Sequence, residues 1–96
     1  MKLEILPSAW DDLADGFWFY EARSPGLGNY FRESLIADIE SLLIHAGIHR
    51  AVMGYHRLLA TRFPFAIYYS CTTETVTIHA VLDCRRDPAW IREHLK

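Results

Sequence analysis

The stretch that decides the fold is TRFPFAIYYS at residues 61–70, in which a proline precedes an almost continuous run of apolar residues. Successive side chains of a β-strand point to opposite faces, so Phe65, Ile67 and Tyr69 share one face and the residues between them share the other. Because both faces are largely apolar, the run predicts a central strand. Pro64 falls at the start of this strand, where its missing N–H group costs little. One face is expected to pack under helices, and the other to form the floor of a site.

Two further strand-like runs lie on either side of the central one. HRLLATR at residues 56–62 precedes it by two residues, and VTIHAVL at residues 76–82 follows it after the turn TTET. Connections of this length are typical of antiparallel strands that follow one another in a sheet. In the last run, strict alternation predicts Val76, Ile78, Ala80 and Leu82 on one face and Thr77, His79 and Val81 on the other. A short first strand, KLEIL, is expected at residues 2–6.

Three segments have the apolar spacing of helices. The first covers about residues 8–22, and Asp11 follows Ser8 at the spacing of a capping box. The second covers about residues 27–46 and is followed by a glycine, a natural stop. About four residues join these helices, so they form an αα-hairpin whose apolar stripes need another surface to cover them. The third is DPAWIREHL at residues 87–95, which has an aspartate as its cap and a proline at its first helical position.

The order of these elements and the composition define a single α+β domain over residues 1–96. We expect an N-terminal strand, the αα-hairpin on one face of an antiparallel sheet (β-α-α-β-β-β), and a short C-terminal helix. A chain of 96 residues supports one hydrophobic core. Hydrophobic residues make up 51%, and no apolar run approaches the roughly 20 residues that a membrane span needs. The N-terminus does not resemble a signal peptide, which predicts a cytoplasmic protein with Cys71 and Cys84 as free thiols.

Charge is unevenly distributed along the chain. Residues 1–48 hold 3 Lys and Arg against 8 Asp and Glu, whereas residues 49–96 hold 7 against 4, so the halves carry net charges of −5 and +3. A dipolar surface of this kind steers binding partners even though the whole chain carries only −2. In the acidic half, Asp11, Asp12 and Asp15 are predicted to be solvated at the start of the first helix.

Metal binding is not predicted. His45 and His49 stand at i and i+4, but Gly47 between them is expected to end the helix, and no Cys or acidic ligand completes the set. No cofactor is predicted either.

Three segments together resemble the RelE/ParE superfamily of bacterial toxins from type II toxin–antitoxin systems. They are FYEARSPGLGNYF at residues 19–31, FPFAIYY at residues 63–69 and AVLDCRRDP at residues 80–88. The similarity is closer to the ParE-like branch, often labelled plasmid stabilisation proteins, than to the RelE-like branch. The resemblance implies a toxin that is neutralised by a cognate antitoxin, whose extended segment wraps the helices and the sheet.

The two branches differ in chemistry. The ParE-like branch is associated with poisoning of DNA gyrase, which is an act of binding. The RelE-like branch cuts mRNA in the ribosome, and it commonly has a basic residue in the middle strand and often a tyrosine in the tail. This sequence has Ala66 and Trp90 at those places, and tryptophan stacks on bases but cannot exchange a proton. These differences favour a binding inhibitor of gyrase over the alternative, a ribosome-dependent mRNA endoribonuclease. A second alternative is a non-toxic relative that only binds an antitoxin.

The candidate site residues divide by role. The residues expected to bind the target, through their cationic groups and one indole, are Arg57, Arg62, Arg85, Arg86 and Trp90. In the nuclease alternative, His56 or His79 would transfer protons and Arg85 and Arg86 would bind phosphate. The aromatic residues expected to bind the antitoxin are Trp18, Tyr20 and Tyr30. Trp18 is the leading one, because it lies off the stripe formed by Trp10, Phe17 and Tyr20.

Overall fold

The structure is a computed structural model that describes residues 1–95. Its elements are β1 (Lys2–Ile5), α1 (Pro7–Glu21), α2 (Leu27–Glu40), α3 (Leu42–His45), β2 (Ala51–Val52), β3 (Tyr55–Leu59), β4 (Phe65–Cys71), β5 (Thr75–Asp83) and α4 (Pro88–His94). The predicted α+β class and order of elements are confirmed. Two elements were not predicted: α3, which is separated from α2 at Ser41, and the two-residue strand β2.

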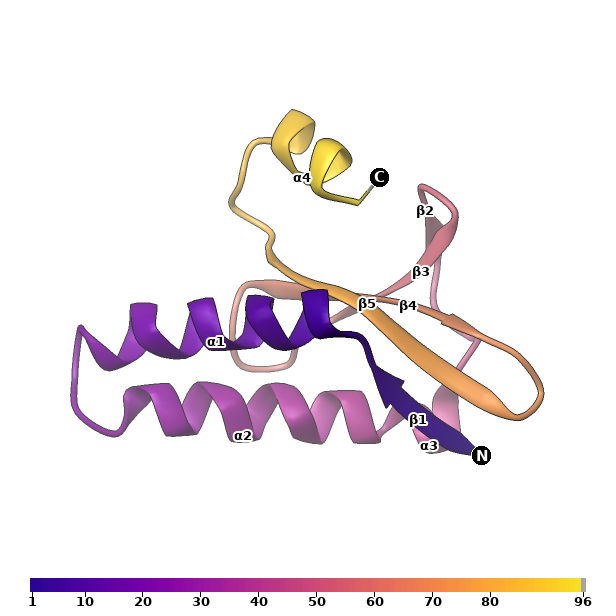
Figure 1. The fold of residues 1–96 in the computed structure, drawn as a ribbon, viewed down its shortest axis with the longest axis horizontal. Coiled ribbons are helices and arrows are strands. Elements are labelled where there is room, and N and C mark those ends of the chain that lie inside the picture. The colour runs from indigo at the N-terminus through magenta and orange to yellow at the C-terminus, as the bar shows by residue number, and fades with distance from the viewer. Residues whose placement is uncertain (96) are drawn as a thin grey trace.

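The five strands form one sheet in the order β1-β5-β4-β3-β2, with β4 in the centre as predicted (Figure 1). β2, β3, β4 and β5 pair antiparallel with their neighbours. β1 departs from this pattern because it pairs parallel with β5, with Leu3 opposite Val76. The helical hairpin between β1 and the rest of the sheet supplies the long crossover that a parallel pair requires.

The sheet has two apolar faces, and a β-bulge decides which residues belong to each. The hairpin face carries Phe65, Ile67, Tyr69, Val76, Ile78 and Val81, and the α4 face carries Ala66, Tyr68, Ala80 and Leu82. Tyr68 lies opposite Ala80 and Tyr69 opposite Ile78, so His79 has no cross-strand partner. The strict alternation predicted along β5 is therefore wrong beyond Ile78, because the extra residue of the bulge moves Val81 to the hairpin face.

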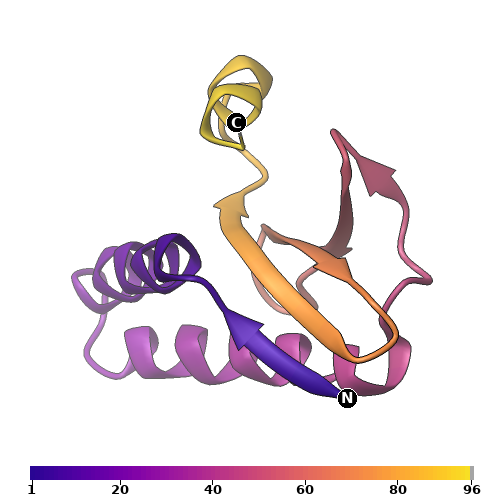
Figure 2. The ribbon, with the colours of Figure 1, turned by 45° about the vertical axis from the view of Figure 1, so that its right-hand side comes forward.

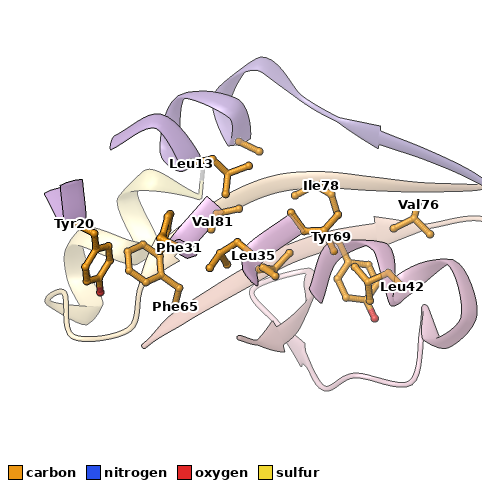
Figure 3. Close-up of a cluster of buried hydrophobic side chains, with 13 residues drawn as sticks. Leu13, Tyr20, Phe31, Leu35, Leu42, Phe65, Tyr69, Val76, Ile78 and Val81 are labelled. Carbon is orange, nitrogen blue, oxygen red and sulfur yellow. The ribbon is translucent and has the colours of Figure 1, made fainter. Parts of the chain in front are cut away.

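Two glycines let α1 and α2 approach closely beneath the hairpin face. A Cβ atom on Gly16 would lie 2.4 Å from the Phe31 ring, and one on Gly28 would lie 2.7 Å from the Phe17 carbonyl oxygen. Phe31 is fully buried, and the Tyr20 ring stacks on it at 5.1 Å. Figure 3 shows Phe31 and Tyr20 at one end of the core and Tyr69 with Leu42 at the other. The glycines therefore set the distance between the helices and the core.

The two long helices begin in different ways, and the capping box predicted at Ser8 of the first is wrong. α1 begins at Pro7, and the Ser8 hydroxyl donates to the His79 carbonyl oxygen at 3.0 Å, so Ser8 does not cap the helix. At α2, the Glu21 carboxylate accepts hydrogen bonds from the Gly26 and Gly28 N–H groups at 3.0–3.2 Å. Glu21 therefore takes the role of a side-chain cap from the preceding helix.

Replacement of Glu21 by alanine is expected to lower the free energy of unfolding by about 1 kcal/mol, because the first N–H groups of α2 lose a charged acceptor. Glu21→Gln retains one acceptor oxygen and should cost less. Thermal unfolding of both variants checks this, with Glu33→Ala on the exposed side of α2 as a control that should leave stability nearly unchanged. Equal effects of the Glu21 and Glu33 substitutions would contradict the capping role.

The α4 face is covered by α4 and bordered by β2 and β3. Asp87 caps α4 by accepting from the Ala89 N–H group at 2.9 Å, with Pro88 at the first helical position, as predicted. Leu95 is buried and Ile91 half-buried against the sheet. Figure 2 shows α4 and β2 rising at either side of this face, away from the helical hairpin. No helix within residues 1–95 combines the length and apolar character that crossing a bilayer would need.

Candidate functional site

The turn that follows β5 holds Arg85, one of the arginines predicted to bind the target, in an ion pair with Asp83. The Asp83 carboxylate accepts from Arg85 Nε at 3.0 Å and from an Arg85 terminal nitrogen at 2.7 Å. Asp83 also accepts from the Arg85 backbone N–H at 2.8 Å. These hydrogen bonds lower the pKa of the Asp83 carboxyl below its ordinary value, and the pair raises the pKa of Arg85. The Arg85 guanidinium remains exposed but is oriented by its own strand.

Arg86 begins a stacked column on one side of α4. Its guanidinium carbon lies 4.1 Å from the centre of the Trp90 ring, and the His94 ring stacks on Trp90 at 4.8 Å with an interplanar angle of 18°. Trp90 and His94 are spaced four apart, which aligns them along one face of α4, and Arg86 stacks on Trp90 from the turn before the helix. This Arg86 column (Arg86, Trp90, His94) brings together two of the predicted target-binding residues, whereas Arg85 is turned to Asp83.

His94 connects the column to α1 through a buried carboxylate. His94 Nε2 lies 3.3 Å from Asp12 Oδ1, and Asp12 Oδ2 accepts from the Val81 N–H group at 3.0 Å. Asp12 was predicted to be solvated with its neighbours, which is wrong, because only 9% of it is exposed. Burial raises the pKa of its carboxyl above the ordinary value. β1 pairs with β5 only as far as Ile78, so the Val81 N–H group has no strand beside it on that edge. The Asp12 carboxylate takes the place of a neighbouring strand there.

A groove of about 390 Å³ opens between α1, the end of β5 and α4. Its lining carries both signs of charge, because it contains the carboxylates of Asp12, Asp15 and Asp83 together with the Arg86 guanidinium. Phe19 and Trp90 supply the aromatic part of the lining. The surface around the Arg86 column is thus amphipathic and of mixed charge, not uniformly basic.

Arg57 and Arg62 lie outside the Arg86 column, one on β3 and the other in the turn that follows β3. Arg57 pairs opposite Tyr68 and so belongs to the α4 face, where it lies close enough to Cys84 to oppose the rise that burial causes in the pKa of that thiol. Arg62 is exposed in the turn between β3 and β4. No contact joins the four predicted arginines into one cluster among the described residues.

The two histidines of the nuclease alternative lie on opposite faces of the sheet. His56 stacks on Tyr69 at 5.2 Å on the hairpin face, and its Nδ1 lies 2.9 Å from the His49 carbonyl oxygen. His79 is on the α4 face, where its Nε2 lies 2.8 Å from Ser70 Oγ. Burial lowers the pKa of His79. The two imidazoles therefore cannot act together on one substrate.

The aromatic residues predicted to bind an antitoxin are separated by the fold. Trp18 is 66% exposed and Tyr30 48% exposed, but Tyr20 is only 9% exposed and belongs to the core. Tyr20 therefore offers little surface to a partner. Trp10, predicted on the buried stripe, is half exposed instead. The buried stripe of α1 contains Ala9, Asp12, Leu13, Gly16 and Tyr20.

Trp10 and Trp18 form an aromatic groove on the outer side of the helical hairpin. The groove has a volume of about 270 Å³, and the side chains that line it are those of Trp10, Leu13, Ala14, Phe17, Trp18 and Arg32. Arg32 covers the Phe17 ring at 5.1 Å. Contiguous exposed apolar surface of this kind is a common mark of a protein interface.

Comparisons with known proteins bear on the fold. No model of a protein family matches the chain, and no curated protein matches its sequence significantly. Among solved structures, a chain of the chromosomal ParDE TA system from P. aeruginosa superposes with a TM-score of 0.75. The match covers 84% of this chain and 92% of that chain at 20% sequence identity. The two chains share one fold. The predicted resemblance is thereby confirmed at the level of the ParDE-like fold.

Proposed function

We propose that this chain is the toxin component of a bacterial type II toxin–antitoxin system, which inhibits growth by binding an essential target and is neutralised by a cognate antitoxin. The observation that carries the proposal is the shared fold with a chain of a ParDE TA system, over 84% of this chain and 92% of that one. The exposed aromatic groove on the hairpin supports a protein partner, since isolated monomers rarely expose neighbouring tryptophans.

The proposed target is DNA gyrase, and the proposed mode of action is binding. Catalysis of RNA cleavage needs a general base, a general acid and cationic groups around one phosphate. Here the two candidate proton-transfer groups, His56 and His79, lie on opposite faces of the sheet. The α4 face carries Ala66 where a nuclease relative commonly has a basic residue, and the cation Arg85 is already paired with Asp83. This arrangement supports a binding surface centred on the Arg86 column, with Arg57, Arg62 and Arg85 around it.

The endoribonuclease alternative rests on the α4 face. Arg57 and His79 lie on this face, with Tyr68 opposite Arg57 on the neighbouring strand and Ser70 bonded to His79. A phosphate on this face would meet one cation and one imidazole of lowered pKa.

Antitoxin binding is the part of the proposal that a growth assay tests. We expect that induction of the chain arrests growth, that a small DNA-binding antitoxin is encoded beside it, and that coexpression of this antitoxin restores growth. Trp18→Ala should weaken binding of that antitoxin by about 10- to 100-fold, the usual cost of removing a central interface aromatic. The growth arrest by this variant should therefore persist despite coexpression.

Leu59→Ala is the control, because Leu59 is also an exposed apolar residue but lies on β3, outside the helical hairpin and the aromatic groove. Hydrogen exchange with and without antitoxin gives an independent map. Protection should increase over residues 8–46. Unchanged exchange throughout this range, or full neutralisation of the Trp18→Ala variant, would remove the aromatic groove as the antitoxin site.

A further inference from the structure

The segment that leads from α3 to the sheet, residues 46–50, is anchored at several points, and one of them is the Tyr69 hydroxyl group, which two residues of the segment share. Tyr69 is fully buried on the hairpin face, and its hydroxyl oxygen accepts from the Gly47 N–H group at 3.0 Å. The same oxygen lies 2.6 Å from His49 Nδ1. Figure 3 shows the Tyr69 ring beside Leu42, with its hydroxyl at the edge of the core cluster. Ala46 packs on the core and the Arg50 carbonyl oxygen accepts from the Arg57 N–H group, so the Tyr69 hydroxyl is the buried polar anchor for the residues between them.

The protonation state of His49 follows from this geometry. A phenolic hydroxyl has one proton to donate, and its oxygen already accepts from Gly47. The hydroxyl is fully used when its proton goes to an unprotonated Nδ1 of His49. Protonated His49 carries a proton on Nδ1 as well, so Nδ1 could no longer accept and the proton of the buried phenol would lose its acceptor. The contact in which every polar group is satisfied therefore has a neutral His49.

A second imidazole reinforces the arrangement. His56 Nδ1 lies 2.9 Å from the His49 carbonyl oxygen, which can only accept, so His56 donates there and fixes the backbone of the segment over β3. The His56 ring also stacks on Tyr69. A proton on His49 would place a positive charge beside His56 and near His45, in a cluster without a carboxylate partner among the described contacts.

We propose that Gly47, His49 and Tyr69 form a pH-sensitive clasp that holds residues 46–50 against the sheet at neutral pH and releases them on acidification. The clasp lies on the hairpin face and uses none of the residues assigned to target or antitoxin binding. Release frees the segment that positions β2, which borders the α4 face. Acid would therefore loosen one wall of that face while the core remains folded.

The direction of the pH dependence follows from the groups around His49. The titratable side chains near the clasp are His45 of α3, His56 of β3, and Tyr69 and Cys71 of β4. Burial, followed by repulsion from His56 and His45, lowers the pKa of His49 from its ordinary 6.5. A lowered histidine pKa in the closed form means that closure is favoured above about pH 6.5 and is progressively lost as pH falls below it.

Hydrogen exchange at the Gly47 amide tests the clasp. Protection factors, which remove the intrinsic pH dependence of exchange, should fall by roughly 10- to 30-fold between pH 7.5 and pH 5.0, as expected when the open form contains a histidine of ordinary pKa. The Ile67 amide in the central strand should keep its protection at both values, which distinguishes local release from unfolding.

Three variants make the test specific. Tyr69→Phe keeps the ring but removes the acceptor, so Gly47 should exchange rapidly at both pH values. His49→Gln cannot gain a proton and should abolish the pH dependence. His45→Gln removes an exposed histidine of the same region that makes no contact in the clasp, and should leave the pH dependence in place. Equal protection of Gly47 at both pH values in the unsubstituted protein, or a pH dependence that survives His49→Gln, would overturn the proposal.

Discussion

Gly16→Ala is expected to destabilise the protein by about 3 kcal/mol, although the same substitution inside a helix ordinarily stabilises by about 1 kcal/mol. The new Cβ would lie 2.4 Å from the Phe31 ring. Phe31 is fully buried and has no room to move away, because the centres of the Phe63 and Phe65 rings lie only 5.1 and 4.9 Å from the centre of its own ring. For a domain of this size, the loss corresponds to a decrease of about 10–20 °C in the melting temperature.

A double-mutant cycle shows whether this contact is the cause. Phe31→Leu shortens the side chain that the new methyl group meets, so Gly16→Ala should cost at least 1 kcal/mol less in the Phe31→Leu background than in the original protein. Chemical denaturation of the four proteins gives the coupling energy. Additive effects, or a Gly16→Ala variant as stable as the original, would contradict the close packing of α1 against Phe31.

Simultaneous replacement of Arg85 and Arg86 by alanine is expected to abolish growth inhibition and leave the fold intact. Both guanidinium groups are exposed, and two of the groups they contact, Asp83 and Trp90, are themselves accessible. Removing exposed side chains usually changes stability by less than about 0.5 kcal/mol, so the loss should be one of target binding. Induction of the variant in growing cells, together with its melting temperature, gives the two readouts.

The controls for this variant come from the same helix. Arg92→Ala removes a cation from α4 outside the Arg86 column and should retain growth inhibition. Arg86→Lys keeps the charge but loses the planar stacking on Trp90, and should inhibit only weakly. Full inhibition by the Arg85→Ala/Arg86→Ala variant would place the target-binding surface elsewhere. A large decrease in its melting temperature would show that the pair is structural.

Periodicity and turn chemistry predicted most of the fold. The central strand was recognised because both of its faces are apolar, and α4 because Asp87 and Pro88 mark a helix start. The β-bulge at His79 was not predicted, because an inserted residue leaves the composition of the strand unchanged and only its partner strand reveals the shift. The parallel pairing of β1 could not be predicted either, since it depends on where the hairpin returns the chain.

The candidate site was less predictable, because it depends on contacts between distant segments. Asp12 looks like a solvated residue of an acidic helix start, and its burial becomes apparent only when β5 presents an unpaired N–H group to it. Tyr20 was expected to bind the antitoxin and Trp10 to lie on the stripe that faces the core, yet Tyr20 is buried and Trp10 is half exposed, because the buried face of α1 is formed by Ala9, Asp12, Leu13, Gly16 and Tyr20. His94 could have been identified, because its spacing of four from Trp90 predicts a stacked pair on α4.

The most direct test of the account is the supercoiling activity of purified DNA gyrase titrated with the purified chain. We expect stoichiometric amounts of the chain to inhibit supercoiling, and the His56→Ala and His79→Ala variants to inhibit it equally well. We also expect mRNA in a translating extract to stay intact when the chain is in excess. Loss of a general acid or base typically costs about 10²- to 10⁴-fold in rate, so a nuclease would reveal itself in these variants. Unimpaired gyrase, together with mRNA cleavage at defined codon positions that His56→Ala or His79→Ala abolishes, would contradict the account.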